Sequence, residues 1–446
     1  MPNPPAKTRY GLLAATSVIV ANMIGTGVFT SLGFQLVDLR AGFPILLLWA
    51  LGGLAAFAGA MCYAELGAAL PRSGGEYHFL REIYHPAAGF VSGWISSTIG
   101  FAAPIALAAI TFAAYGLSVL APDAPPLAQK GLALALIAAL SIVHASRRAI
   151  SGGMQSAFTL FKIAAILAFC AGALFLLDTP EPVRLAPAPG DGAIIASSAF
   201  AIALIYVSYA YAGWNAATYI TAEIARPERN LPRVLAAGSL IVTVLYVALN
   251  SAFMAAAPRE ALVGKVEIGF IAAQGIFGDA AANVAGLVMA SLLVSTVSAM
   301  TIAGPRVLQA IGEDFAFFRP LAATNRDGIP SRAIYAQTAI AAFLIATSSF
   351  QSILIFAGFL TALNSFFTVL ALIVLRWRRP ALHRPFRTPF YPATPLVYLA
   401  LTGWTLIYVL ISRPAEVAFA AGLIVIGLGF YALTRGGSPP LKRLFP

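Results

Sequence analysis

The chain has 446 residues, of which 60% are hydrophobic and 10% charged, with a net charge of +11 and a mean hydropathy of +0.85. A soluble globular protein has about 25% charged residues, so this composition excludes an ordinary soluble domain and indicates an all-α polytopic membrane protein. The positive charge does not indicate nucleic-acid binding, because most Lys and Arg residues lie in every second loop between apolar runs, which is the pattern that membrane topology produces.

Apolar runs of spanning length, which is about 17–25 residues, recur along the whole chain. Almost no loop separates the ninth run from the tenth, so Ser348 to Gln351 is expected to form a tight turn. The sequence predicts 12 transmembrane helices, at residues 10–38, 43–70, 87–120, 128–146, 154–177, 193–222, 233–257, 278–304, 332–349, 351–377, 393–411 and 415–434.

The distribution of basic residues predicts the orientation. Most of the 28 Lys and Arg residues lie on the side of the N-terminus, and the side richer in basic loops is normally cytoplasmic. We therefore expect a multi-pass protein of the cell inner (cytoplasmic) membrane with both termini cytoplasmic. Two loops on the inner side, 71–86 and 305–331, are partly apolar, and each is expected to form short helices at the membrane surface.

The first run contains a weak point at Asn22 to Phe29, where Gly25 and Gly27 flank Thr26. Each glycine costs a helix interior about 1 kcal/mol relative to alanine, and an opened backbone inside a membrane must find new partners. Free N–H groups at Gly25 and Gly27 would favour a carboxylate, and carbonyl groups near Met23 would favour an ammonium group. The alternative is that these small residues form only a close helix–helix contact.

Lys162 is the one charge deep within a spanning run. An ionisable residue inside the membrane indicates a functional site, so this amine is a candidate for proton coupling. The alternative is that the side chain extends along the helix to the inner interface. Lys162 stands about eight residues into its helix, roughly 12 Å from the start, which is a long way for a lysine side chain to extend to the inner interface.

A second weak point, Tyr209 to Asn215, contains Gly213 beside aromatic residues. Tyrosine, tryptophan and asparagine side chains at this depth each need hydrogen-bonding partners. An aromatic packing cluster is the alternative interpretation. Interruptions at corresponding places in two halves of a chain are the best sequence indication of a transporter binding site, so the pair favours a site for a zwitterion.

These motifs resemble those of the amino acid–polyamine–organocation (APC) superfamily, and most closely its L-type amino acid transporter branch. The resemblance is carried by Asn22 to Phe29, by Tyr209 to Asn215 continuing to Glu223, by Tyr63 to Gly67, and by Pro71 to Tyr77. It implies a LeuT-type fold. The expected parts are a first inverted repeat of five helices at 1–190, a second at 191–380, and helices eleven and twelve with a cytoplasmic tail at 381–446.

The resemblance also implies roles for individual residues. Thr26 and Gly27 would hold the substrate carboxylate, and the carbonyl groups of Met23, Tyr209 and Ala212 would receive the amino group. Tyr209 would also gate the pocket, and Asn215 would tie the unwound segment to neighbouring backbone. The expected substrate-binding set is Met23, Ile24, Gly25, Thr26, Gly27, Tyr209, Ala210, Ala212 and Asn215, and the expected gating set is Tyr209, Trp214, Glu65 and Glu223.

Two positions narrow the expected substrate and coupling. Related exchangers of cationic amino acids have an aspartate near Ala212, so alanine there favours neutral substrates. In relatives that resemble this chain, a lysine at the position of Lys162 stands in the place of a sodium ion, with Ser295 and Thr296 as plausible neighbours. The resemblance thus implies sodium-independent transport, either by exchange or coupled to protons.

The expected function is secondary active transport of neutral L-amino acids by alternating access, in the lipid bilayer and without a cofactor. Glu65 and Glu223 stand at inner helix ends, where pairing with loop arginines is the simple interpretation and a gating role is the alternative. The four histidines do not have metal-ligand spacing, and no catalytic cluster is evident. A polyamine or other organic-cation transporter of the same fold is the alternative function, although no carboxylate is evident in the middle of the expected pocket helices.

Overall fold

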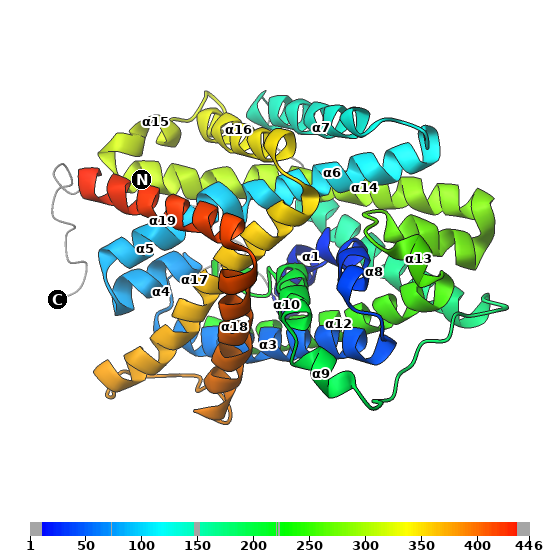
Figure 1. Ribbon diagram of the computed structural model, residues 1–446. Helices are drawn as coiled ribbons and strands as arrows, with labels where there is room; N and C mark the ends of the chain where they lie inside the picture. The colour runs from blue at the N-terminus through cyan, green and yellow to red at the C-terminus, as the bar shows by residue number, and fades with distance from the viewer. Residues whose placement is uncertain (1–10, 73, 147–151, 220, 222–223, 435–446) are drawn as a thin grey trace.

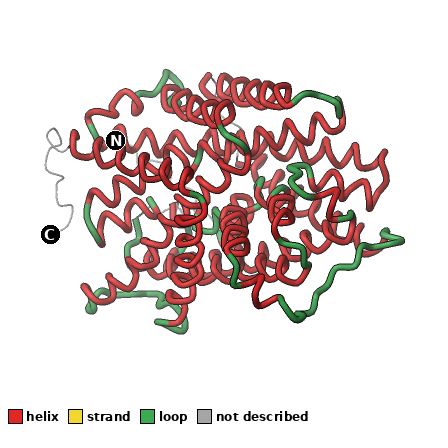
Figure 2. Tube along the Cα trace, viewed as in Figure 1, coloured by secondary structure: helices red, strands yellow, loops and turns green. Residues whose placement is uncertain are grey.

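A computed structural model describes residues 11–72, 74–146, 152–219, 221 and 224–434, and the regular elements in these ranges are helices (Figure 2). The first spanning run is broken into α1 (Leu12–Met23), a 3₁₀ turn at Gly27–Phe29, and α2 (Ser31–Asp38). The sixth run is broken into α10 (Ser198–Tyr211) and α11 (Ala216–Tyr219). Both interruptions therefore occur at the two glycine-containing segments that the sequence singled out.

The other helices follow in chain order. Those before α10 are α3 (Gly42–Ala69), α4 (Gly75–Ile83), α5 (Pro86–Ile95), α6 (Ala102–Leu120), α7 (Pro126–Ser146), α8 (Gly152–Phe175) and α9 (Asp191–Ile195). Those after α11 are α12 (Pro227–Ala256), α13 (Arg259–Leu262), α14 (Ile268–Asp314), α15 (Arg319–Ala322), α16 (Ser331–Thr347), α17 (Phe350–Arg378), α18 (Ala393–Ser412) and α19 (Pro414–Thr434).

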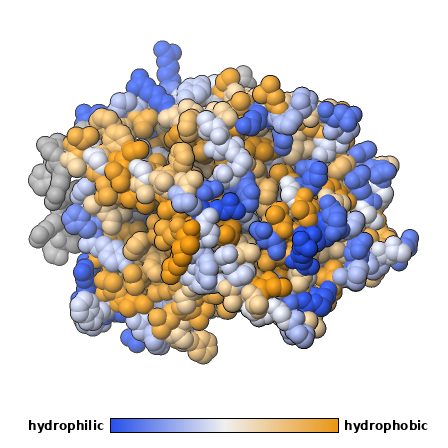
Figure 3. Space-filling model, viewed as in Figure 1, coloured by the Kyte–Doolittle hydropathy of each residue, from blue (hydrophilic) through white to orange (hydrophobic). Residues whose placement is uncertain are grey.

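Eight helices in the described ranges are long and apolar enough to cross a membrane, and three further apolar helices are shorter, among them α1 and α10. Large apolar side chains are exposed on the outer helices, for example Leu127 on α7, Phe175 on α8 and Leu433 on α19. Figure 3 shows such apolar side chains spread widely over one face. The chain is an all-α, multi-pass membrane protein, as the composition indicated; the count of 12 spans and the division at residues 190 and 380 stay predictions.

Three segments refine the expected helix pattern. The tight turn is confirmed, because α16 ends at Thr347 and α17 begins at Phe350. The expected span at 87–120 is confirmed as one continuous apolar helix from Pro86 to Leu120, in which a π-helical turn at Ser96–Gly100 joins α5 to α6. The inner loop at 305–331 is shorter than expected, because α14 continues through Pro305 to Asp314, where Leu308 and Ile311 keep the helical spacing and are buried.

The packing brings the two broken helices to the centre of the molecule. Helix α12 packs along α3 and against α1, α6 packs along α14, and α10 contacts α3, α17 and the 3₁₀ turn of the first break. Figure 1 shows α1 and α10 in the middle, with α4 and α5 toward the left end and α13 toward the right. We call the left end, which the sequence predicts to be cytoplasmic, the α4 side.

Candidate functional site

The first break replaces about one helical turn with irregular, largely buried backbone. Helix α1 ends at Met23, Ile24 is non-helical with ψ 85°, and the Gly25 N–H turns back to donate to the Met23 carbonyl oxygen at 2.8 Å. We expected a free N–H group at Gly25, but this short turn uses it. The amides of Thr26 and Gly27 have no hydrogen-bonding partner among the described residues, so these two are the donors that can receive an anion.

The second break depends on a glycine. Ala212 has ψ 139° and Gly213 has φ +107°, a conformation that L-residues with a side chain rarely adopt. A Cβ atom at Gly213 would also lie 2.9 Å from the carbonyl group of Asn22. The chain therefore needs glycine here both to turn and to lie against the end of α1.

The two breaks are in direct contact. A Cβ atom at Gly27 would lie 2.5 Å from Cα of Ala210, closer than packed atoms can approach. Tyr246 of α12 lies between them, with its hydroxyl oxygen 2.5 Å from the Met23 carbonyl oxygen and 3.1 Å from that of Ala210. Tyr246 is fully buried, and a lone tyrosine in a spanning run gave no sequence signal for this role.

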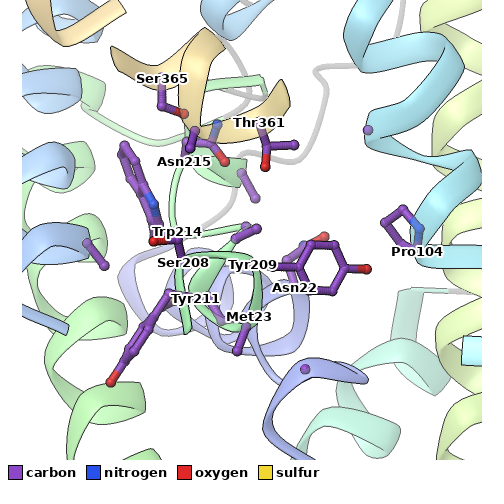
Figure 4. Close-up of a pocket in the computed structure, with 18 of the residues that line it drawn as sticks. Asn22, Met23, Pro104, Ser208, Tyr209, Tyr211, Trp214, Asn215, Thr361 and Ser365 are labelled. Atoms are coloured by element: carbon purple, nitrogen blue, oxygen red, sulfur yellow. The ribbon is translucent and has the colours of Figure 1, made fainter. Parts of the chain in front are cut away.

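A cavity of about 210 Å³ lies at the junction of the breaks (Figure 4). Its volume is suited to a small molecule, and both breaks contribute backbone and side chains to it. In Figure 4 Tyr209 lies beside Asn22 at the centre, whereas Tyr211 points away and donates to the Trp49 carbonyl oxygen at 2.9 Å. The candidate residues that line the cavity are Met23, Gly25, Thr26, Gly27, Tyr209, Ala210, Ala212, Trp214, Asn215 and Thr296.

The remaining candidates lie elsewhere. Ile24, Lys162 and Ser295 are buried near the cavity but do not line it, and Glu65 lies in a separate ion-pair cluster. Glu223 is outside the described residues.

The carbonyl groups of the predicted ammonium site are not equally open. The Met23 oxygen already accepts from Gly25 and Tyr246, and the Tyr209 oxygen accepts from the Ala212 N–H at 2.9 Å. The Ala212 oxygen accepts no hydrogen bond from the described part of the chain. In this conformation Ala212 is thus the best placed of the three to receive an ammonium group.

Lys162 spans the gap between three helices. Its ammonium nitrogen lies 3.2 Å from the Ile24 carbonyl oxygen and 2.9 Å from the hydroxyl of Thr296 on α14, and the residue is 4% exposed. The side chain therefore points into the protein and does not extend to an interface. Ser295 is buried nearby, but no hydrogen bond joins it to Lys162 among the described contacts.

The α4 side of the cavity holds a carboxylate that the sequence analysis missed. Glu76 lines the cavity and is 4% exposed. Its oxygen atoms accept from the side chains of Tyr63 at 2.5 Å, Asn215 at 3.0 Å, Ser365 at 3.0 Å, and Asn364. Burial raises the pKa of the Glu76 carboxyl group, and these hydrogen bonds act in the opposite direction.

This arrangement changes the expected role of Asn215. The side chain was expected to bind neighbouring backbone, but its amide donates to the Glu76 carboxylate instead. Figure 4 shows Asn215 and Ser365 pointing toward one another. The only hint in the sequence was that Glu76 follows Gly74 and Gly75 in the motif that opens the first inner loop.

A π-helical turn forms another wall of the cavity. Ser96 and Gly100, at the two ends of this turn, line the cavity together with Pro104 and Met300. Single π-helical turns are often found at functional sites, because the extra residue widens the helix locally. Besides Ser96, the lining residues of this wall are glycine and apolar residues.

The candidate gates pack in two separate groups. Trp214 contacts the rings of Tyr63 and Tyr398, with centroid distances of 4.6 and 6.2 Å. Glu65 is fully buried and pairs with Arg376 of α17 at 2.6 Å, and it also accepts from the Thr388 N–H at 2.7 Å. Glu65 therefore pairs with an arginine, as the simpler of its two interpretations from the sequence predicts. The gating roles of Glu65 and Trp214 stay predictions.

Comparisons with known proteins agree on one family. The profile of the family described as amino acid permease matches residues 10–430. The chain is 28% identical to the large neutral amino acids transporter small subunit 2 of Mus musculus, over 96% of this chain and 81% of that protein. It is 30% identical to the Asc-type amino acid transporter 1 of Homo sapiens, over 96% and 82%, and 28% identical to the b(0,+)-type amino acid transporter 1 of Homo sapiens, over 95% and 87%.

Proposed function

Since the chain belongs to the amino acid permease family, we propose that it carries neutral L-amino acids across the cytoplasmic membrane by alternating access, without sodium. The family and its relatives are transporters and not enzymes. The observation that carries the proposal is the junction of the two broken helices at one cavity. Opposed helix breaks offer both signs of partial charge within a few residues, which matches a zwitterion.

The substrate is expected to bind by its backbone groups. Its carboxylate would accept from the free amides of Thr26 and Gly27, at the start of the 3₁₀ turn, where the partial charge is positive. Its ammonium group would donate to the carbonyl oxygen of Ala212, at the end of α10, where the partial charge is negative. The side chain would then lie toward the π-helical turn and Tyr209.

Two features favour a neutral side chain over a polyamine or another organic cation. Ala212 brings no charge to the cavity. Glu76 does bring one, but both of its oxygens already accept from four donors in Tyr63, Asn215, Asn364 and Ser365. A cation would have to compete with these donors for a carboxylate that is only 4% exposed. The name of the similar large neutral amino acids transporter is consistent with this proposal.

Lys162 supports sodium-independent coupling. Its ammonium group occupies the space between the Ile24 carbonyl oxygen and the Thr296 hydroxyl, and a sodium ion would need oxygen ligands of this kind. A fixed ammonium group there supplies the positive charge and links the first break to α14. Exchange and proton symport are both compatible with this arrangement.

Uptake into proteoliposomes tests the proposed function. The purified protein would be reconstituted and given neutral, cationic and acidic amino acids and a polyamine, in buffers with sodium or choline, with and without internal amino acid and a proton gradient. We expect saturable uptake of at least one neutral amino acid in choline buffer, unchanged by sodium. Uptake of the polyamine alone, or uptake that requires sodium, would contradict the proposal. Empty liposomes and the Gly27→Val protein are the controls.

A further inference from the structure

Glu76 has no role in the transport scheme described so far, although it is buried beside the cavity. We propose that Glu76 is a positioning residue, a latch that fastens the unwound segment after α10 to α3 and α17 and slows the return of the empty carrier. The inference rests on the proposed transport function. We call Glu76, Tyr63, Asn215, Asn364 and Ser365 the Glu76 cluster.

The first argument is that the cluster joins four separate parts of the fold. Tyr63 belongs to α3, Glu76 to α4, Asn215 to the second break, and Asn364 and Ser365 to α17. All four partners donate to the same carboxylate. Hydrogen bonds to a charged group are stronger than those between neutral groups, so a movement of the second break away from α17 must break strong contacts.

The second argument is that the backbone is built to bring Glu76 to this place. Gly74 and Gly75 have φ values of +132° and +52°, which turn the chain sharply before α4. A Cβ atom at Gly75 would lie 2.8 Å from the ring of Tyr219 on α11. The glycine pair thus allows the start of α4 to lie directly against the half-helix that follows the second break.

The third argument is that the latch adjoins the substrate site. Asn215 and Glu76 both line the cavity, and they are hydrogen-bonded to each other at 3.0 Å. The neighbouring residue, Trp214, packs on the ring of Tyr63, whose hydroxyl donates to Glu76. A change in the unwound segment on substrate binding is therefore transmitted to the latch through two adjacent residues.

A latch has a kinetic consequence that a purely structural residue lacks. Exchange uses only the loaded carrier, whereas net efflux also requires the empty carrier to return. If the Glu76 cluster holds the empty carrier, its loss raises net efflux relative to exchange. If Glu76 only supports the fold, its loss lowers both rates together and leaves their ratio unchanged.

The experiment compares Glu76→Ala with Glu82→Ala in proteoliposomes loaded with the best neutral substrate. Glu82 is an exposed carboxylate on the same helix, so it is the matched control. The ratio of net efflux, without external substrate, to exchange, with external substrate, is measured for each protein. For Glu76→Ala we expect the ratio to rise at least about tenfold, as for the loss of one charge-assisted hydrogen bond, and for Glu82→Ala we expect the wild-type ratio.

Glu76→Gln makes the test independent of the folding of the alanine variant. Glutamine keeps one acceptor oxygen for Tyr63, Asn215 and Ser365, and the amide of Asn364 can turn to accept from the new donor. Its ratio is expected to lie between those of wild type and Glu76→Ala. An unchanged ratio in Glu76→Gln, or in a folded Glu76→Ala, overturns the latch. Absence of any transport by the wild-type protein overturns the proposed function instead.

Discussion

Replacement of Gly27 with valine is expected to abolish transport. The Cβ atom alone would lie 2.5 Å from Cα and 2.7 Å from Cβ of Ala210, and both obstacles are rigidly attached to α10. The valine side chain would therefore force the two breaks apart and displace the amides of Thr26 and Gly27 from the carbonyl group of Ala212. Initial uptake rates and substrate binding by the purified variant are the measurements.

Gly25→Ala is the matched control for this prediction. A Cβ atom at Gly25 would meet only the Met23 carbonyl oxygen, at 3.9 Å, and its φ is not in the left-handed region. The alanine variant keeps its N–H group and should retain most of the wild-type uptake. Normal uptake by Gly27→Val in a correctly folded protein would show that the contact between the breaks is not required.

Replacement of Lys162 with alanine is expected to reduce the initial uptake rate by at least about tenfold, because two buried hydrogen bonds from a charged donor are lost. The Ile24 carbonyl oxygen and the Thr296 hydroxyl would lose their ammonium partner inside the membrane. If Lys162 carries the coupling proton, the residual rate should also lose its dependence on pH. Uptake measured across a pH series with a fixed internal pH tests both effects.

Lys130→Ala provides the control for loss of a lysine. Lys130 lies at a half-buried position on α7 and donates to the Ala346 carbonyl oxygen at 3.1 Å, so its removal should leave the pH–rate curve unchanged. A wild-type pH–rate curve in Lys162→Ala would exclude proton coupling through this amine. If Lys162→Ala also transported at the wild-type rate, the lysine would not be needed to link the first break to α14.

The positions of both breaks could be predicted because their causes are local. Gly25, Gly27 and Gly213 weaken a helix in any surroundings, and the sequence spacing places them within apolar runs. The partner of Lys162 on α14 was also anticipated, because the family resemblance places Ser295 and Thr296 beside this lysine. The membrane class followed from composition alone, because apolar segments of this length and number are typical of helices that span a lipid bilayer.

The contacts that complete the site could not be predicted, because they join distant segments. Tyr246 is hydrogen-bonded to Met23, and Glu76 to Asn364, and in each pair the two residues are more than two hundred positions apart in the sequence. A tyrosine in a spanning helix and a glutamate in a loop both have ordinary interpretations, and only the packing of α4 and α12 brings them to the cavity. The use of the Gly25 amide within its own turn likewise depends on dihedral angles that no residue pattern specifies.

Calorimetric binding to the wild-type protein in sodium-free buffer tests the zwitterion site most directly. The neutral amino acid that is taken up best would be compared with the amine that lacks its carboxylate and the acid that lacks its amino group. Because each end is expected to make charge-assisted hydrogen bonds of about 1.5–3 kcal/mol, both analogues should bind at least about tenfold more weakly. Binding of either analogue with the affinity of the amino acid would contradict a site built from the two breaks.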